Sequence, residues 1–103
     1  MLNNKTALIT GGAKGIGAAC SRVFYRENAQ VAILDTDPLG QQLAAELGDR
    51  ALFIQCDVSN EAQVKAAIEK VAAHFGGIDV LVNNAGIQRY STVTETSEDE
   101  WDL

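Results

Sequence analysis

The strongest constraint on the fold of this chain is a glycine-rich stretch, T-G-G-A-K-G-I-G, which runs from Thr10 to Gly17. It follows a short apolar run at 6–9, typical of a buried strand, and precedes a segment whose apolar residues recur at helical spacing. Gly11 allows a sharp turn off the strand, and Gly15 allows a ligand to approach the backbone without meeting a Cβ. Gly17 allows the helix to pack closely on the sheet. The stretch therefore predicts a tight strand-to-helix turn.

Such a turn can hold phosphate groups, because unpaired N–H groups and the positive end of the helix dipole point to the same place. Its glycines are spaced G-x-x-x-G-x-G, which differs from the commonest dinucleotide-binding pattern, G-x-G-x-x-G. No Gly-Lys-Ser/Thr closes the stretch, so it is not a Walker A loop. The alternative is a glycine-rich turn without a ligand, which the strand-to-helix context disfavours.

Strand and helix patterns continue to alternate along the chain. The expected strands are the apolar runs at 6–9, 31–34, 51–54 and 78–82. The expected helices run from about 15 to 28, from Asp37-Pro38 to about 47 before Gly48, and from a cap at Ser59 to Gly76-Gly77, and Ser97 with Glu100 begins another. Wholly apolar strands between helices indicate a parallel sheet covered on both faces. This α/β order predicts the N-terminal half of a Rossmann-type doubly wound sheet, β-α-β-α-β-α-β.

Two of these helices carry an apolar face that we expect to cover the sheet. The first face comprises Ile16, Ala19, Cys20, Val23 and Phe24, and the face of the third helix comprises Val64, Ala67, Ile68, Val71 and Phe75.

Three motifs in this order resemble the short-chain dehydrogenase/reductase family. The family pattern T-G-x-x-x-G-[IL]-G matches Thr10 to Gly17 throughout, Asp57-Val58 follows the third strand, and Asn83-Asn84-Ala85-Gly86 follows the fourth. The resemblance covers essentially the whole chain, and it implies the N-terminal part of an NAD(P)-dependent enzyme that transfers hydride between a nicotinamide cofactor and an alcohol or ketone. A dinucleotide-binding module without catalysis and a non-functional truncated product are the alternatives.

The end of the second strand bears on which nicotinamide dinucleotide is bound. Asp35 stands there, where a carboxylate can accept hydrogen bonds from the adenine ribose and repel a 2′-phosphate. This favours NAD over NADP, whereas an exposed strand-end acid without a ligand is the weaker alternative. In the resembling family, a basic residue at the position of Lys14 often accompanies NADP. Asp35 outweighs it here, because Lys14 can extend into solvent.

The resemblance also assigns roles to the later motifs. It implies that Asp57 binds the adenine amino group and that Val58 adds a backbone contact, although Asp57 can equally be a turn acid beside Ser59. Asn84, Ala85 and Gly86 would pass beside the adenosine ribose, and Asn83 would tie neighbouring strands. The expected cofactor-binding residues are thus Gly11, Lys14, Gly15, Ile16, Gly17, Asp35, Asp57, Val58, Asn84, Ala85 and Gly86.

No catalytic residue is expected in this chain. The family uses a Tyr-x-x-x-Lys pair with a Ser and an Asn, but Tyr90 is followed four residues later by Thr94. We expect a truncated NAD(P)-binding domain over residues 1–103 that ends at Leu103 before the catalytic segment and is inactive by itself. Its fourth strand would be an open edge of the sheet, so we expect marginal stability. By analogy, the full-length protein forms a homo-oligomer.

Composition excludes several other classes of function. The chain of 103 residues carries 8 Lys and Arg against 14 Asp and Glu, a net charge of −6, which argues against nucleic-acid binding and is explained by solubility. It has neither a secretory signal nor an apolar run long enough to cross a bilayer, which favours a cytoplasmic protein without membrane partners. Cys20 and Cys56 lack metal-ligand spacing, so we expect buried thiols and no metal.

Overall fold

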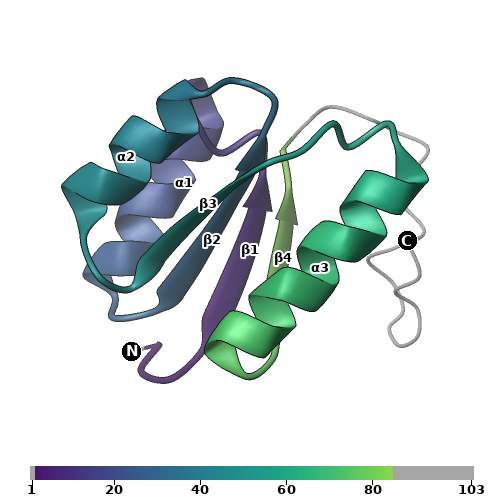
Figure 1. Cartoon of the computed structure of the whole chain (residues 1–103). Coiled ribbons are helices and arrows are strands. Elements are labelled where there is room, and N and C mark those ends of the chain that lie inside the picture. The colour runs from purple at the N-terminus through teal and green to yellow at the C-terminus, as the bar shows by residue number, and fades with distance from the viewer. Residues whose placement is uncertain (1, 85–103) are drawn as a thin grey trace.

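The computed structural model describes residues 2–84 (Figure 1). Its elements are β1 (Thr6–Thr10), α1 (Gly15–Arg26), β2 (Gln30–Asp35), α2 (Leu39–Leu47), β3 (Ala51–Gln55), α3 (Glu61–Phe75) and β4 (Val80–Asn83). These bounds agree with the expected strands and helices to within two residues, which is the usual uncertainty of an element's ends. The helix expected from Ser97 lies outside the described residues.

The four strands form one parallel sheet in the order β3-β2-β1-β4. Helices α1 and α2 cover one face and α3 covers the other (Figure 1). In the centre of the sheet, Leu8 of β1 lies between Ala32 of β2 and Leu81 of β4. Among the described residues β4 pairs only with β1, so it forms an edge of the sheet. The predicted N-terminal half of a Rossmann-type sheet is therefore confirmed.

Strand β2 shows why both faces must be covered. Val31 and Ile33 pack in the cluster beneath α1 and α2, whereas Ala32 and Leu34 pack in the cluster beneath α3, and all four are fully buried. A strand that is apolar on both sides can be buried only between two layers of helices. The uninterrupted apolar runs thus determine the three-layer arrangement.

Helix α3 packs as its sequence pattern predicts, but its cap differs. Its inner face contributes Val64, Ala67, Ile68, Val71 and Phe75 to one cluster. The cap is Asn60, whose Oδ1 accepts the Gln63 N–H at 3.1 Å, so the prediction of Ser59 as the cap was wrong. Ser59 instead bonds to the Asp57 carboxylate. The helix ends, as expected, at Gly76, which has a left-handed φ of 92°.

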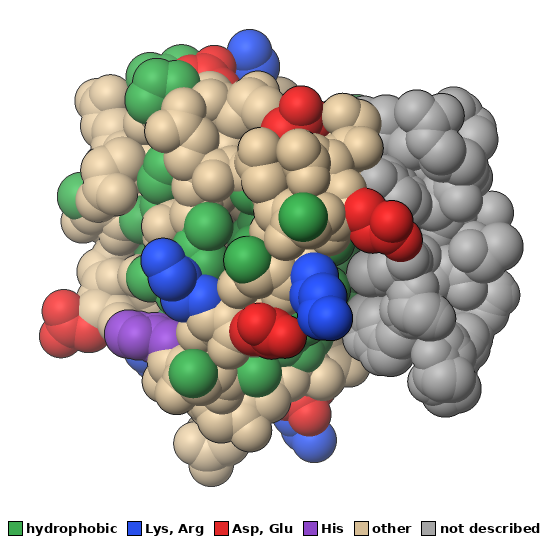
Figure 2. Space-filling view, turned by 45° about the vertical axis from the view of Figure 1, so that its right-hand side comes forward, with side chains coloured by type: hydrophobic (Ala, Val, Ile, Leu, Met, Phe, Trp, Pro, Cys, Tyr) green, Lys and Arg blue, Asp and Glu red, His purple; other side chains and the backbone are tan. Residues whose placement is uncertain are grey.

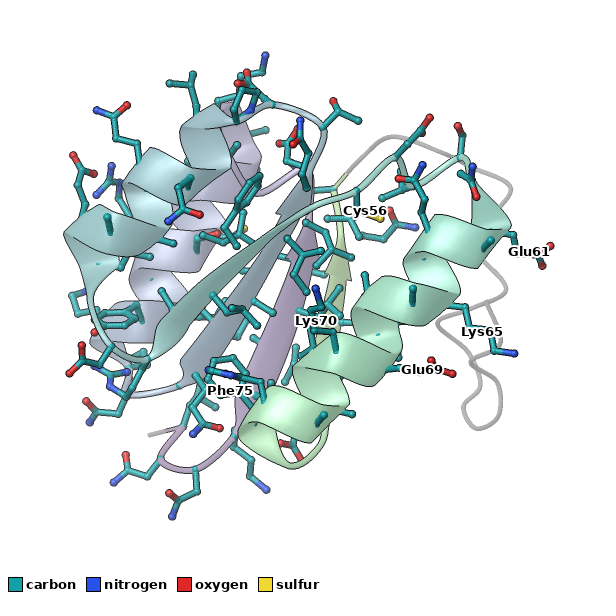
Figure 3. The ribbon with its side chains drawn as sticks, in the orientation of Figure 1. Cys56, Glu61, Lys65, Glu69, Lys70 and Phe75 are labelled. Carbon is teal, nitrogen blue, oxygen red and sulfur yellow. The ribbon has the colours of Figure 1, made fainter. Side chains whose placement is uncertain are left out.

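The outer surface of α3 is exposed and mixed in charge. Glu61, Lys65 and Glu69 point away from the sheet (Figure 3), and acidic and basic side chains alternate over this side of the molecule (Figure 2). Such mixing produces no extended field of one sign. In the part of the chain that the structure describes, no helix is long and apolar enough to cross a membrane.

Helix α1 approaches the sheet through small residues. Gly17 and Ser21 are buried, while Ile16 and Val23 are 73% and 44% exposed and Ala19 is exposed as well, so the prediction that these three face the core was wrong. The other expected face residues, Cys20 and Phe24, are partly buried against the core. A helix whose contact line is glycine and serine lies too close to the sheet for larger residues to fit beneath it.

Helix α2 begins at Leu39 with Pro38 as its N-cap residue, so the prediction of Asp37 as the cap and Pro38 as the first helical residue was wrong by one position. Asp37 Oδ1 accepts the Leu39 N–H at 2.9 Å, and Pro38 already has helical dihedral angles (φ −63°, ψ −8°). Gly48 follows its last residue, as expected.

The end of β1 is tied to the end of β4 by one hydroxyl group. Thr10 Oγ1 donates to Asn83 Oδ1 at 3.1 Å and accepts the Asn84 N–H at 3.0 Å. Thr10 is only 9% exposed, so few water molecules can replace these partners. The expected structural role of Asn83 between neighbouring strands is therefore confirmed.

The first testable prediction concerns this hydroxyl. Thr10→Val keeps the shape of the side chain but leaves the Asn84 N–H and the side-chain carbonyl of Asn83 without their hydrogen-bond partner. This loss costs about 1–3 kcal/mol of unfolding free energy. Urea unfolding followed by circular dichroism measures the loss. Thr10→Ser keeps the hydroxyl and should lose clearly less; equal losses in the two variants would contradict a role for the hydrogen bonds.

Candidate functional site

An open pocket of about 420 Å³ lies at the carboxyl ends of the parallel strands. It is lined by Gly11, Lys14, Leu34, Asp35, Thr36, Cys56, Asp57, Val58 and Asn84. Figure 3 shows Cys56 at this end of the sheet and Phe75 at the opposite end. Its volume is in the range of small-molecule sites, and open α/β sheets bind ligands at this edge.

The pocket brings together residues from four parts of the chain that the sequence analysis had selected separately. Six of the expected cofactor-binding residues line it, namely Gly11, Lys14, Asp35, Asp57, Val58 and Asn84. The expected residues Gly15, Ile16 and Gly17 form the first turn of α1 and do not line the pocket itself. Ala85 and Gly86 lie outside the described residues, as does Tyr90.

Sequence reasoning missed three lining residues, Leu34, Thr36 and Cys56. Each is adjacent in sequence to Asp35 or Asp57, at the end of β2 or just after β3. Their positions at strand ends could have identified them, because the carboxyl ends of parallel strands share one edge of the sheet.

The two later glycines of the turn serve different purposes. Gly15 has a left-handed φ of 61°, and a Cβ added there would meet nothing within 4 Å. At Gly17, by contrast, a Cβ would collide with the Gly11 carbonyl oxygen and would lie 2.7 Å from Asn84 Nδ2. Gly15 therefore leaves open space above the backbone, whereas Gly17 permits a close contact inside the protein.

The start of α1 has no side-chain cap. Lys14 is the N-cap residue in extended conformation, its side chain makes no capping hydrogen bond, and the first turn contains no acidic residue. The first N–H groups and the positive end of the helix dipole are therefore not neutralised by a local carboxylate. Together with the open space at Gly15, this gives a surface suited to an anion.

The Asp35 carboxylate is held by two backbone groups. Its Oδ2 accepts the Ala13 N–H and its Oδ1 accepts the Asp37 N–H, both at 3.0 Å. These bonds join the glycine turn to the segment after β2 and fix the carboxylate at the edge of the pocket. Each oxygen can accept a further hydrogen bond, so Asp35 can still receive a hydroxyl donor.

Lys14 is paired with an acid, which differs from the expectation that it extends freely into solvent. Its Nζ lies 3.1 Å from Asp37 Oδ2, although the lysine side chain remains 69% exposed. The hydrogen bond from the Leu39 amide, and to a smaller extent that from the Lys14 ammonium, holds the pKa of the Asp37 carboxyl below its usual value. Asp37 is therefore ionised at neutral pH and neutralises the cation beside the pocket.

Asp57 has the turn role that its sequence position left open, and it also lines the pocket. Its Oδ1 accepts the backbone N–H of Ser59 at 2.9 Å and the Ser59 hydroxyl at 2.6 Å, so it is a turn acid. These two hydrogen bonds keep the pKa of the Asp57 carboxyl below its usual value, and the bond from the Ser59 hydroxyl has the larger effect. Asp57 also lines the pocket, where an ionised carboxylate can accept hydrogen bonds from an amino group.

The remaining polar wall of the pocket is structural as well. The side chain of Asn84 donates from Nδ2 to the Gly11 carbonyl at 3.3 Å, which joins the segment after β4 to the turn after β1.

Cys56 lines the pocket with a buried thiol. It is 2% exposed, and burial together with the Asp57 charge raises the pKa of its thiol. The thiol is therefore neutral at physiological pH and forms an apolar part of the wall.

No metal centre is formed by residues 2–84, since no three His, Cys, Asp or Glu side chains among them are arranged to hold an ion. The site geometry therefore consists of carboxylates, amides and the uncapped start of a helix, together with one paired lysine.

Comparison with known proteins gives consistent matches. The family model for short chain dehydrogenases matches residues 5–103. Momilactone A synthase from Oryza sativa subsp. japonica is 49% identical over 84% of this chain, and D-threitol dehydrogenase from Mycolicibacterium smegmatis is 45% identical over 98% of it. The crystal structure of 3-ketoacyl-(acyl-carrier-protein) reductase from Brucella melitensis, complexed with NADH, superimposes with a TM-score of 0.82 over 84% of this chain at 44% identity.

The chain spans 32% and 40% of the length of these two relatives and 36% of the length of the crystallised reductase. The residues that the family model matches include the glycine turn and every strand of the described sheet. The chain belongs to the short-chain dehydrogenase/reductase family.

Proposed function

We propose that residues 1–103 form the NAD(P)-binding domain of an oxidoreductase that transfers hydride between a nicotinamide cofactor and a small-molecule alcohol or ketone. The observation that carries this proposal is the open space above Gly15, at the uncapped start of α1, directly beside a pocket lined by two carboxylates. The NADH named with the Brucella melitensis reductase supports the same assignment. A dinucleotide-binding module without catalysis is the alternative.

The residues present fit a dinucleotide. The N–H groups around Gly15, Ile16 and Gly17 would hold the pyrophosphate, because they lie at the positive end of the helix. Asp35 would accept the ribose hydroxyls and Asp57 the adenine amino group, since ionised carboxylates are acceptors only. The other proposed cofactor-binding residues are Gly11, Lys14, Val58, Asn84, Ala85 and Gly86.

We propose NAD as the preferred cofactor, with NADP less favoured. The Asp35 carboxylate is fixed at the pocket edge by the Ala13 and Asp37 amides, so it cannot easily rotate away from a 2′-phosphate. A phosphate brought against a fixed carboxylate experiences direct charge repulsion. The two ribose hydroxyls of NAD instead donate to it.

The described residues bind and orient the cofactor, which when bound supplies or accepts the hydride. Hydride transfer in the family also needs a Tyr-x-x-x-Lys pair, and neither Tyr25 nor Tyr90 is followed by lysine four residues later. We therefore propose that residues 1–103 do not turn over substrate by themselves. For the whole protein we propose a cytoplasmic location and, by analogy with the family, a homo-oligomer without nucleic-acid or membrane partners.

The second prediction tests cofactor binding directly. Titration of the protein with NADH, followed by calorimetry or by nicotinamide fluorescence, should give saturable binding. Absence of saturation at millimolar NADH, in protein shown by circular dichroism to be folded, would reject the proposed function. Saturable binding without turnover agrees with both the oxidoreductase and the binding module, because residues 1–103 contain no Tyr-x-x-x-Lys pair.

The third prediction separates backbone strain from loss of the phosphate site. Gly15→Ala places a Cβ in the open space and strains a left-handed residue by about 1–2 kcal/mol. NADH affinity should fall about tenfold or more, because a single hydrogen bond to a charged group is worth this much. The control is Gly76→Ala, since Gly76 also has a positive φ and open surroundings but lies at the far end of α3.

Gly76→Ala should show similar destabilisation in thermal unfolding and unchanged NADH affinity. If both variants lost affinity equally, the effect of Gly15→Ala would be general strain, and the phosphate site would be contradicted.

The fourth prediction concerns the choice of cofactor. Asp35→Asn keeps one acceptor oxygen but removes the charge, so NADH affinity should fall about tenfold. NADPH affinity should fall less or rise, because the repulsion of the 2′-phosphate is gone. Dissociation constants for both nucleotides measure the ratio, and an unchanged ratio would show that Asp35 does not discriminate between them.

A further inference from the structure

Lys14 is in the position from which a cation would attract a cofactor phosphate. It begins α1 and also lines the pocket, beside Asp35 and Thr36. Among the described residues that line the pocket, it is the only cation. Its charge therefore determines much of the local potential that a nucleotide meets at this edge.

The Lys14 ammonium group already forms an ion pair with an acid. Lys14 Nζ lies 3.1 Å from Asp37 Oδ2, and Asp37 does not itself line the pocket. The acid thus lies behind the lysine and neutralises it from outside the pocket. The pocket lining contains two carboxylates, Asp35 and Asp57, and one ammonium group, so its net charge is negative, and Asp37 adds a third carboxylate just outside it.

Asp37 is held in place more firmly than its partner. Its Oδ1 accepts the Leu39 N–H at 2.9 Å, and its own N–H donates to Asp35 Oδ1 at 3.0 Å. Its side chain is 24% exposed, compared with 69% for Lys14. Because the acid is fixed by the start of α2, only the lysine loses side-chain freedom when the pair forms, which favours the paired state.

We propose that Asp37 is a second determinant of cofactor choice, which acts by holding Lys14 away from the position of a 2′-phosphate. This inference rests on the proposed NAD-binding function and extends it to a residue outside the pocket. A dinucleotide with a 2′-phosphate would have to break the pair, and it would then meet two carboxylates. NAD carries no group there and leaves the pair intact.

The test is the substitution Asp37→Asn, which removes the charge and keeps an oxygen for the Leu39 N–H. Dissociation constants for NADH and NADPH are measured by fluorescence titration. NADPH should bind about tenfold tighter than to the unmodified protein, since Lys14 gains one charge-assisted bond to phosphate. NADH affinity should change less than about threefold, because no bond to it is lost. Asp37→Ser, another good capping residue, should behave alike if the first variant folds poorly.

Two further variants make the result specific. In Lys14→Gln/Asp37→Asn the gain for NADPH should disappear, because the gain depends on the lysine. Glu46→Gln is the matched control: it removes one negative charge and breaks the Arg22–Glu46 pair, also 3.1 Å long, away from the pocket. It should leave the NADPH-to-NADH ratio unchanged.

The possible outcomes distinguish failure of this inference from failure of the proposed function. An unchanged ratio in Asp37→Asn, a gain that persists without Lys14, or an equal gain in Glu46→Gln would overturn this inference and leave NAD binding intact. If the unmodified protein bound neither nucleotide, the proposed function would fail and the inference with it.

Discussion

The close contact at Gly17 is the constraint on which the rest of the site depends. There the first turn of α1, the Gly11 carbonyl and the Asn84 side chain meet without room for a Cβ. A larger residue would separate the helix from the end of β1 and would displace the segment after β4. The strand ends, the uncapped helix start and the pocket between them are therefore consequences of one missing side chain.

Much of this arrangement follows from local patterns. The apolar runs and the glycine spacing specified the strands, the parallel sheet and the turn, because burial on both faces and positive φ angles leave few alternatives. The predicted inner face of α1 was wrong at Ile16, Ala19 and Val23, because helical periodicity does not show that glycine and serine make the contact with the sheet. The shift of the α3 cap from Ser59 to Asn60 has a similar cause: two adjacent residues can both cap, and Asp57 engages the first.

In the candidate site, too, some features could be predicted from the sequence and others could not. Carboxylates at strand ends could be selected from sequence, because topology places all such ends at one edge. The pairing of Lys14 with Asp37 could not, because it joins the start of α1 to the start of α2 through their relative placement in space. The sequence offered the turn role of Asp57 as an alternative, but it did not reveal that Asp35 and Asn84 also hold local structure. The polar groups of the site are thus positioned by the bonds that they make within the fold.

The strand order has a consequence for how the molecule assembles. Strands β1, β2 and β3 are joined by successive short crossovers, but β4 pairs with β1 across 73 residues of sequence, as in the register pair of Ala7 with Val80. Closing this longest loop has the largest entropic cost of any pairing in the sheet, so β4 is expected to dock after the other strands. Asn84 and the hydrogen bonds of the Thr10 hydroxyl take their places only when β4 docks. The pocket is therefore expected to be complete only at the last stage of folding.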